Sequence, residues 1–211
     1  PDPRRPAHNR ADRLDELLSS VGAALKAELA SVASATDVGF DAGGDAVEAI
    51  KRLAGELEAA NPTPVTSRAD ALLKGRWRLL YSSFGLHRDA TLARLSFNAL
   101  PKTPVHVTDL WQEVDPATGL YDNIVDHDEG SVVTLGHFTP ASDQRLDVVF
   151  TDMLVTGLGG CRVSIDNAKI PPLYSDVTYL DEDFRLNRGS YGSLYILQCV
   201  EREPVRWARA G

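Results

Sequence analysis

The stretch "GRWRLLYSSFG", residues 75–85, carries the alternation that decides the fold class. With a period of two residues, Trp77, Leu79 and Tyr81 face one way, and the intervening residues, two of them arginines, face the other. This pattern predicts a β-strand with an apolar inner face and a polar outer face. Such an inner face either packs in a core or contacts a ligand, and the rest of the sequence is needed to distinguish these two possibilities.

The same alternation continues beyond this strand. Turn-like sequences such as "DPATG", "HDEG" and "LNRGSYG" separate the alternating segments. The predicted strands are 75–83, 104–114, 119–127, 131–139, 145–155, 160–166, 174–180, 183–187 and 192–201. Short consecutive strands without helices between them predict an antiparallel meander, closed into a β-barrel so that no edge is left unpaired.

The N-terminal part has a different period. Residues 11–34 carry apolar side chains three and four positions apart, which predicts an amphipathic helix. A second helix follows, with Asp45 and Glu48 at capping-box spacing. The sequence "NPTP" ends it, because Pro62 lacks an amide hydrogen and disfavours helical geometry in the preceding residue. We therefore expect a mainly β protein with N-terminal helices. It divides into a two-helix extension (1–62), an antiparallel β-barrel domain (63–203) and a C-terminal tail (204–211).

A long connection, residues 85–104, interrupts the series of strands. Its sequence "GLHRDATLARLSFNALPKTP" includes the apolar residues Leu86, Leu92 and Leu95. Long connections of this kind are usually functional or contain a short helix. The sequence leaves two structures open, a lid over the mouth of the barrel and a helix that plugs its core.

Composition limits the classes of function. The 211 residues carry a formal charge of −8, which argues against nucleic-acid binding because phosphate recognition needs a basic face. No segment approaches the about 18 uncharged apolar residues of a spanning helix, so membrane contact is expected to be peripheral. Cys161 and Cys199 form no C-x-x-C motif, and we expect two free thiols. From the start "PDPRR", without a methionine, we expect a processed or trimmed N-terminus, and processing here would mean that a targeting peptide has been removed.

Residues suited to catalysis or metal binding are sparse. His127 lies in the acidic sequence "DHDEG", but such residues are common in turns between strands. Asp181 and Asp183 share one face of a predicted strand, where ion pairing with the nearby Arg185 and Arg188 explains them better than a catalytic carboxylate pair. The sequence has no G-x-S-x-G, P-loop or G-x-G-x-x-G motif. We therefore expect no enzyme and no metal site.

Several motifs resemble those of a known family, the plastid lipid-associated proteins, also called fibrillins or plastoglobulins. "NPTP" followed by "LLKGRWRLLYSS" (72–83) resembles the family's opening, and "DVTYLDEDFRLNRGSYGSLYIL" (176–197) resembles its ending. Gln112 and Asn123 lie where the family tends to have Gln and Asn in consecutive strands. The resemblance extends over residues 47–200.

The resemblance implies a lipocalin-like barrel without catalytic residues. It also implies a plastid location, at thylakoid or plastoglobule surfaces, after removal of a transit peptide. The motif formed by Gly75 and Trp77 is similar to the entry motif of lipocalins. There, an arginine from the final strands stacks on the tryptophan and closes one end of the barrel. Arg185 and Arg188 are the candidates for that arginine here.

Two functions follow as hypotheses. The first is binding of a lipophilic molecule, namely a prenylquinone, a carotenoid or an acyl lipid, inside the barrel. Gln112 and Asn123 then serve as polar anchors, although they could equally bond to each other or to the backbone. Candidate lining residues are Leu79, Tyr81, Leu110, Gln112, Asn123, Val148, Phe150, Leu194 and Ile196. The alternative is a structural subunit that braces a thylakoid pigment–protein complex, with a filled barrel. In it, the N-terminal helix, residues 86–100 and the tail with Trp207 serve as docking elements.

Overall fold

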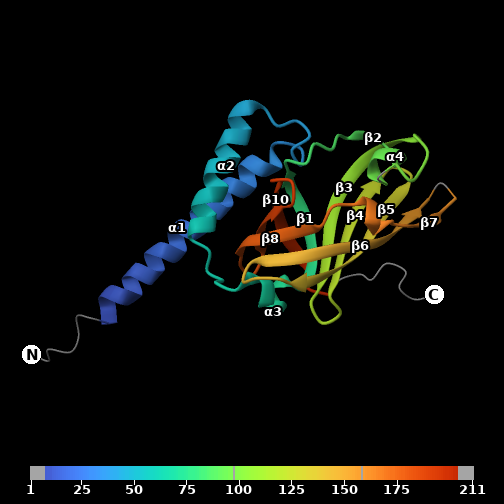
Figure 1. Ribbon diagram of the computed structural model, residues 1–211. Helices are drawn as coiled ribbons and strands as arrows, with labels where there is room; N and C mark the ends of the chain where they lie inside the picture. The colour runs from blue at the N-terminus through green and yellow to red at the C-terminus, as the bar shows by residue number, and fades with distance from the viewer. Residues whose placement is uncertain (1–7, 97, 158, 204–211) are drawn as a thin grey trace, which may run out of the picture.

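The computed structural model describes residues 8–96, 98–157 and 159–203 (Figure 1). The predicted C-terminal tail, residues 204–211 with Trp207, lies outside the described residues, as do residues 1–7. The architecture is an antiparallel sheet closed on itself, with two long helices against one side. The expectation of a mainly β protein with N-terminal helices is therefore confirmed.

Within the described residues, eight antiparallel strands form a closed ring, which we call the strand ring. Each strand pairs with its neighbour in the order β1-β10-β9-β8-β6-β5-β4-β3, and β3 pairs with β1. The closing pairs join Gly75–Arg78 to residues 111–114, so no long edge is left open. The strands of the ring are β1 (Gly75–Ser82), β3 (Pro104–Asp115), β4 (Leu120–His127), β5 (Gly130–Pro140), β6 (Arg145–Thr156), β8 (Leu173–Leu180), β9 (Phe184–Gly189) and β10 (Leu194–Glu201).

Two short strands extend the sheet beyond the ring. β2 (Asp89–Thr91) pairs with the start of β3, and β7 (Cys161–Ser164) forms a hairpin with β6. All nine predicted strands are present within a few residues of their expected bounds, and β2 is the one strand among the described residues that the sequence did not predict. Turn residues bound the strands so clearly that their positions could be predicted from the sequence alone.

The helices α1 (His8–Ser34) and α2 (Gly44–Ala59) pack together across the outer side of the ring (Figure 1). Helix α2 begins after Gly43 without a side-chain cap, and Glu48 pairs with Lys51 at 2.8 Å. The predicted capping box is therefore wrong, because the helix starts one residue before Asp45. The N-terminal part of α1 projects away from the ring, and Val21 there is 56% exposed.

A buried layer, which we call the helix–ring core, joins these helices to the sheet. Its ring members come from β1, β8, β9 and β10, and its helical members are fully buried. The helical extension and the barrel thus share one core. The layer contains Leu29, Ala33, Ile50, Leu53, Ala54, Leu57, Tyr81, Tyr179, Phe184, Leu186, Leu194 and Ile196.

Short helical segments lie at the two ends of the ring. The turn η1 (Thr66–Arg68) and helix α3 (Asp70–Leu73) lie at one end, which we call the α3 end (Figure 1). Helix α4 (Leu92–Leu95) lies at the opposite end, the α4 end, and another turn, η2 (Asn167–Lys169), follows β7. The leucines of α4 are buried against Val107 and Leu110 of β3, so the 85–104 connection packs as a plug at this end.

Candidate ligand-binding interior of the strand ring

Trp77 closes the α3 end of the ring. Its side chain is fully buried, and its indole Nε1 donates a hydrogen bond to the carbonyl of Leu73 at 3.0 Å. The guanidinium of Arg185 lies 4.5 Å from the centre of the indole ring, and that of Arg202 lies 5.6 Å from it. An arginine over an indole face contributes about 0.5–2 kcal/mol, according to how far it is desolvated.

Gly75 and Arg202 secure this closed end from the outside. Gly75 has a φ of 146°, and a Cβ atom there would lie 2.6 Å from the carbonyl oxygen of Glu201. Only glycine accepts both the backbone angle and the close approach. Arg202 donates to the carbonyls of Leu72 and Lys74 at 2.7 and 3.0 Å, which ties the segment directly after β10 to α3. Arg202 was missed in the sequence, although its cationic side chain directly follows the last strand.

Arg188 does not take part in the closure, which corrects the expectation that it shares this role. It forms a two-point ion pair with Glu58 of α2, at 2.8 and 2.9 Å. The reason is its position in β9. Arg185 and Arg188 are an odd number of residues apart, so their side chains leave opposite faces of the strand. Arg185 points into the ring and Arg188 toward the helices.

A chain of polar side chains runs inward from Arg185. Its Nη2 donates to Oε1 of Gln112, and Nε2 of Gln112 donates to Oδ1 of Asn123 at 2.8 Å. The strand register explains the contact, since Gln112 lies opposite both Trp77 on β1 and Asn123 on β4. The sequence left two roles open for Gln112 and Asn123, namely polar anchors for a ligand, or hydrogen bonding to each other or to the backbone. The structure contains the hydrogen bond between them, and Arg185 is a third member of this network.

Arg185 is a cation in an apolar setting. Its side chain is 0% exposed, and this burial lowers its pKa to about 10, so it remains protonated at neutral pH. In the described part of the chain, Nε and Nη1 of Arg185 and Oδ1 of Asn187 have no hydrogen-bond partner. Asn187, which sequence reasoning missed, shares the inward face of β9 because it lies two residues from Arg185.

Six of the nine candidate lining residues face the inside of the ring. Those at the α3 end pack tightly with Trp77, whereas Leu110 packs with α4 at the other end. Leu79 and Asn123 keep some accessible surface although they point inward, as does Tyr195 of β10. The six residues are Leu79, Leu110, Gln112, Asn123, Val148 and Phe150.

The other three candidates lie outside the ring and not in its interior. Tyr81, Leu194 and Ile196 belong to the helix–ring core. A register shift between Leu79 and Tyr81 breaks the alternation of β1, so the two residues face opposite sides. A bulge of this kind cannot be found by counting with a period of two.

The acidic pair Asp181 and Asp183 binds a lysine. Lys26 of α1 donates to Asp181 Oδ2 at 2.9 Å and to Asp183 Oδ1 at 2.5 Å, and Tyr179 donates to Asp181 Oδ2 at 2.7 Å. Ion pairing was expected here, but with Arg185 and Arg188. Burial alone raises the pKa of Asp181, and the hydrogen bonds from Tyr179 and Lys26 outweigh it and hold that pKa below its ordinary value.

The other polar groups singled out in the sequence have structural partners. His127 Nδ1 accepts a hydrogen bond from the backbone amide of Glu129 at 3.2 Å. Among the described residues, no group of three or more His, Cys, Asp or Glu side chains is arranged to hold a metal ion. Cys161 and Cys199 are free thiols, as expected. In the same part of the chain, no helix has the length and apolar character needed to cross a bilayer.

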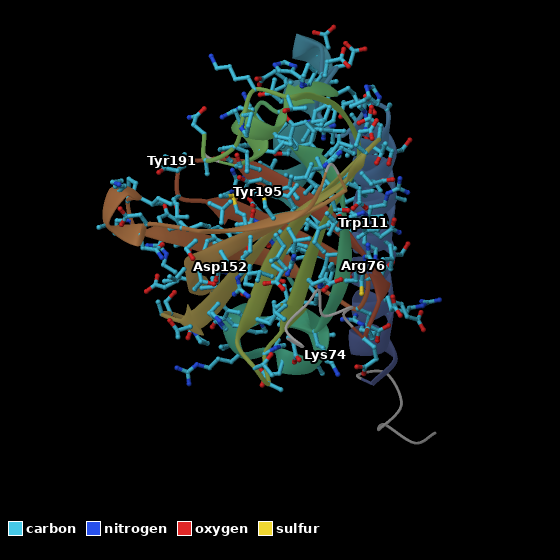
Figure 2. All side chains as sticks on the ribbon, turned by 90° about the vertical axis from the view of Figure 1, so that its right-hand side faces the viewer. Lys74, Arg76, Trp111, Asp152, Tyr191 and Tyr195 are labelled. Atoms are coloured by element: carbon cyan, nitrogen blue, oxygen red, sulfur yellow. The ribbon has the colours of Figure 1, made fainter. Side chains whose placement is uncertain are left out.

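The outer face of β1 and β3 carries a stacked cluster of arginines and tryptophan. Arg76 and Arg78 lie 4.6 and 5.6 Å from the ring centre of Trp111, and Trp111 Nε1 donates to Asp126 at 2.8 Å. Figure 2 shows Arg76 beside Trp111, with Lys74 nearby toward the α3 end. The two arginines that flank Trp77 in the sequence therefore point outward, as the alternation predicts.

Comparison with known proteins identifies the family. The family model described as PAP_fibrillin matches residues 23–170, more than half of the chain. Plastid-lipid-associated protein 6, chloroplastic, from Arabidopsis thaliana is 28% identical over 197 residues, or 82% of this chain and 69% of the relative. The chromoplast-specific carotenoid-associated protein of Cucumis sativus is 27% identical over 221 residues, or 82% of this chain and 66% of the relative. No solved structure matches the chain significantly.

These relatives also agree with the expected location. The names of the Arabidopsis and Citrus unshiu relatives place them in chloroplasts, and that of the cucumber relative in chromoplasts. A plastid location is what the sequence predicts. The matched residues include the C-terminal part of α1, all of α2 and five of the eight strands of the ring. The chain therefore belongs to the PAP_fibrillin family, the plastid-lipid-associated proteins.

Proposed function

We propose that the protein is a non-catalytic carrier that binds one lipophilic molecule inside the strand ring, at thylakoid or plastoglobule surfaces. The ligand class is a prenylquinone, a carotenoid or an acyl lipid. This agrees with the names of the relatives, which associate them with plastid lipids or carotenoids. Burial of an apolar tail at about 25 cal/mol per Å² drives such binding without any reactive group.

The observation that carries this proposal is the partial exposure of inward-facing residues. Leu79, Asn123 and Tyr195 come from three different strands, point inward and are only half-buried. Phe150 and Val148 add an apolar wall beside them. An apolar lining with a few polar groups is typical of sites for small lipophilic ligands. The lipocalin-like mode of closure by Trp77 and Arg185 supports the same class of protein.

The first experiment is extraction of the protein purified from its native membrane. Mass spectrometry then gives the moles of lipid, quinone and pigment per mole of chain. About one mole of a single hydrophobic species supports the carrier. Leu79→Trp, which places a larger side chain in the interior, should weaken rebinding of that species at least about tenfold. The matched control is Val149→Trp on the outer face, where the native side chain is 51% exposed and affinity should not change. Equal affinities in the two variants would place the ligand elsewhere.

A second candidate is a structural subunit that braces a thylakoid pigment–protein complex. The projecting N-terminal part of α1, with Val21 56% exposed, favours it (Figure 1). Deletion of residues 1–22 tests this role, because Leu29 and Ala33 of the helix–ring core stay in place. The subunit role predicts loss of co-sedimentation with isolated thylakoids. The carrier role predicts unchanged ligand affinity. An unchanged sedimentation would dismiss α1 as a docking element.

A further inference from the structure

We propose that the strand ring selects lipophilic molecules whose head group is a hydrogen-bond acceptor, because Asn123 presents only donor hydrogens to the interior. The probe for this head group is a benzoquinone with a prenyl tail, which should bind in preference to its quinol. The inference rests on the proposed function, that of a carrier with its ligand inside the ring.

Arg185 fixes the direction of the hydrogen bonds in this chain of side chains. A guanidinium has five N–H donors and no acceptor, and it cannot reverse its role by rotation or by deprotonation at neutral pH. Arg185 is fully buried and stacked on Trp77, so it has no alternative position in solvent. Its Nη2 donates to Gln112. The atom of Gln112 that meets Arg185 must therefore be the carbonyl oxygen Oε1.

The orientation of Gln112 then fixes that of Asn123. With Oε1 facing Arg185, the NH₂ group of Gln112 is left to face β4, and Nε2 donates to Oδ1 of Asn123 at 2.8 Å. An amide turned the other way would place two donors against each other. Asn123 therefore uses its acceptor within the chain of hydrogen bonds and is left with the two hydrogens of Nδ2.

The hydrogens of Asn123 Nδ2 are available to a ligand. In the described residues, the only side-chain hydrogen bond of Asn123 is the one it accepts from Gln112, and the residue is half-buried. The opposite residue on β5 is Thr134, which lies 8% exposed on the same inner face. A ligand whose carbonyl oxygen lies beside Asn123 can therefore accept a hydrogen bond from Nδ2. A hydroxyl group can also accept, but its own hydrogen then needs an acceptor, and among the described residues the unpaired acceptor on the inner face, Oδ1 of Asn187, is buried on β9, on the opposite side of the ring from β4.

The test compares a prenylated benzoquinone with its quinol, kept reduced under argon. For the native protein, the dissociation constant of the quinone should be roughly tenfold lower, about the value of one hydrogen bond. A second pair, a long-chain fatty acid and the matching alcohol, distinguishes a carboxylate acceptor from a quinone carbonyl. If the protein prefers the fatty acid over the alcohol but does not prefer the quinone over the quinol, the ligand class is a lipid with a carboxylate. That head group is also a hydrogen-bond acceptor.

The decisive variant is Gln112→Glu. Its carboxylate accepts from Arg185 and can no longer donate to Asn123. Asn123 must then turn its NH₂ group toward that carboxylate and its Oδ1 toward the interior, so the preference should invert in favour of the quinol. Gln198→Glu is the matched control, because Gln198 is an exposed residue of β10 and the ratio of the two affinities should stay as in the native protein.

The outcomes separate the inference from the function on which it rests. Equal binding of quinone and quinol, unchanged by Gln112→Glu, overturns donor selection and leaves the carrier intact. Binding of none of the four probes overturns the inference, and the extraction experiment then decides separately whether the ring carries another cargo, such as a carotenoid. If Gln112→Glu does not fold, Asn123→Asp replaces it. Its carboxylate still accepts from Gln112 and presents only acceptor oxygens to the interior, so the preference should again pass to the quinol. A ratio that stays at the native value in that variant also overturns the inference.

Discussion

At the scale of single residues, two arginines on opposite faces of β9 have different structural roles. Arg185 is buried over Trp77, whereas Arg188 is partly exposed and pairs with Glu58. Arg185→Lys should lower the free energy of unfolding by about 2 kcal/mol, because an ammonium loses the planar stacking and the fixed donation to Gln112. Urea denaturation followed by tryptophan fluorescence measures the change.

Arg188→Lys is the matched control, made on the same strand with the same chemical change. An ammonium still pairs with Glu58, and partly exposed ion pairs contribute at most about 1 kcal/mol. The loss in Arg188→Lys should therefore be clearly smaller than in Arg185→Lys. Equal losses would mean that the stack on Trp77 adds no stability. The sequence offered both arginines for this stack, and only the parity of their positions on the strand separates them.

At the scale of elements, strand positions could be predicted and strand faces only in part. Turn sequences such as "DPATG" and "HDEG" mark the limits of β3, β4 and β5 through residues that disfavour strands. The faces depend on bulges, such as the one between Leu79 and Tyr81, which leave no local signal in the sequence. The contact of Gln112 with Arg185 depends on the pairing of β1 with β3, which is a property of the closed ring.

Helix α1 is fastened to the loop between β8 and β9 through Lys26, and this contact should depend on pH. The pKa of Asp181 lies below its ordinary 3.8, so its contribution to stability is present above that pH and is lost as pH falls through the lower value. Burial alone lowers the pKa of Lys26, but the hydrogen bonds that Lys26 donates to Asp183 and Asp181 outweigh it and raise that pKa above 10.5. The contribution of Lys26 to stability is therefore present below pH 10.5 and is lost as the pH rises through the raised pKa of Lys26.

Lys26→Met should therefore lower the free energy of unfolding by up to about 1 kcal/mol near neutral pH, the value expected for a partly exposed ion pair. The difference from the native protein should shrink below pH 3.8 and above pH 10.5. Thermal unfolding across the pH range measures it. Lys51→Met on α2, which breaks an exposed pair with Glu48, serves as control and should change nothing measurable. A loss in Lys26→Met that is constant with pH would point to packing of the lysine stem.

At the scale of the whole molecule, the helices and the ring should unfold together, since the helix–ring core contains side chains from both. Leu53 of α2 is 0% exposed and packs in that core. Leu53→Ala should therefore cost about 2–5 kcal/mol, through lost burial and the cavity left behind. Val21→Ala, at a site 56% exposed on the projecting part of α1, should change stability by less than about 0.5 kcal/mol.

The transitions seen by different probes decide whether this shared core makes one cooperative unit. Far-UV circular dichroism near 222 nm follows α1 and α2. Tryptophan fluorescence follows the strand ring through Trp77 and Trp111, in a Trp207→Phe background that removes the third tryptophan. We expect coincident midpoints in the native protein, and Leu53→Ala should shift both by the same amount, because a helix that leaves the ring exposes Tyr81, Phe184 and Ile196 to water. Loss of the helical signal before the fluorescence change would show that the ring is stable alone, with the helices as a separable cover on its outer face.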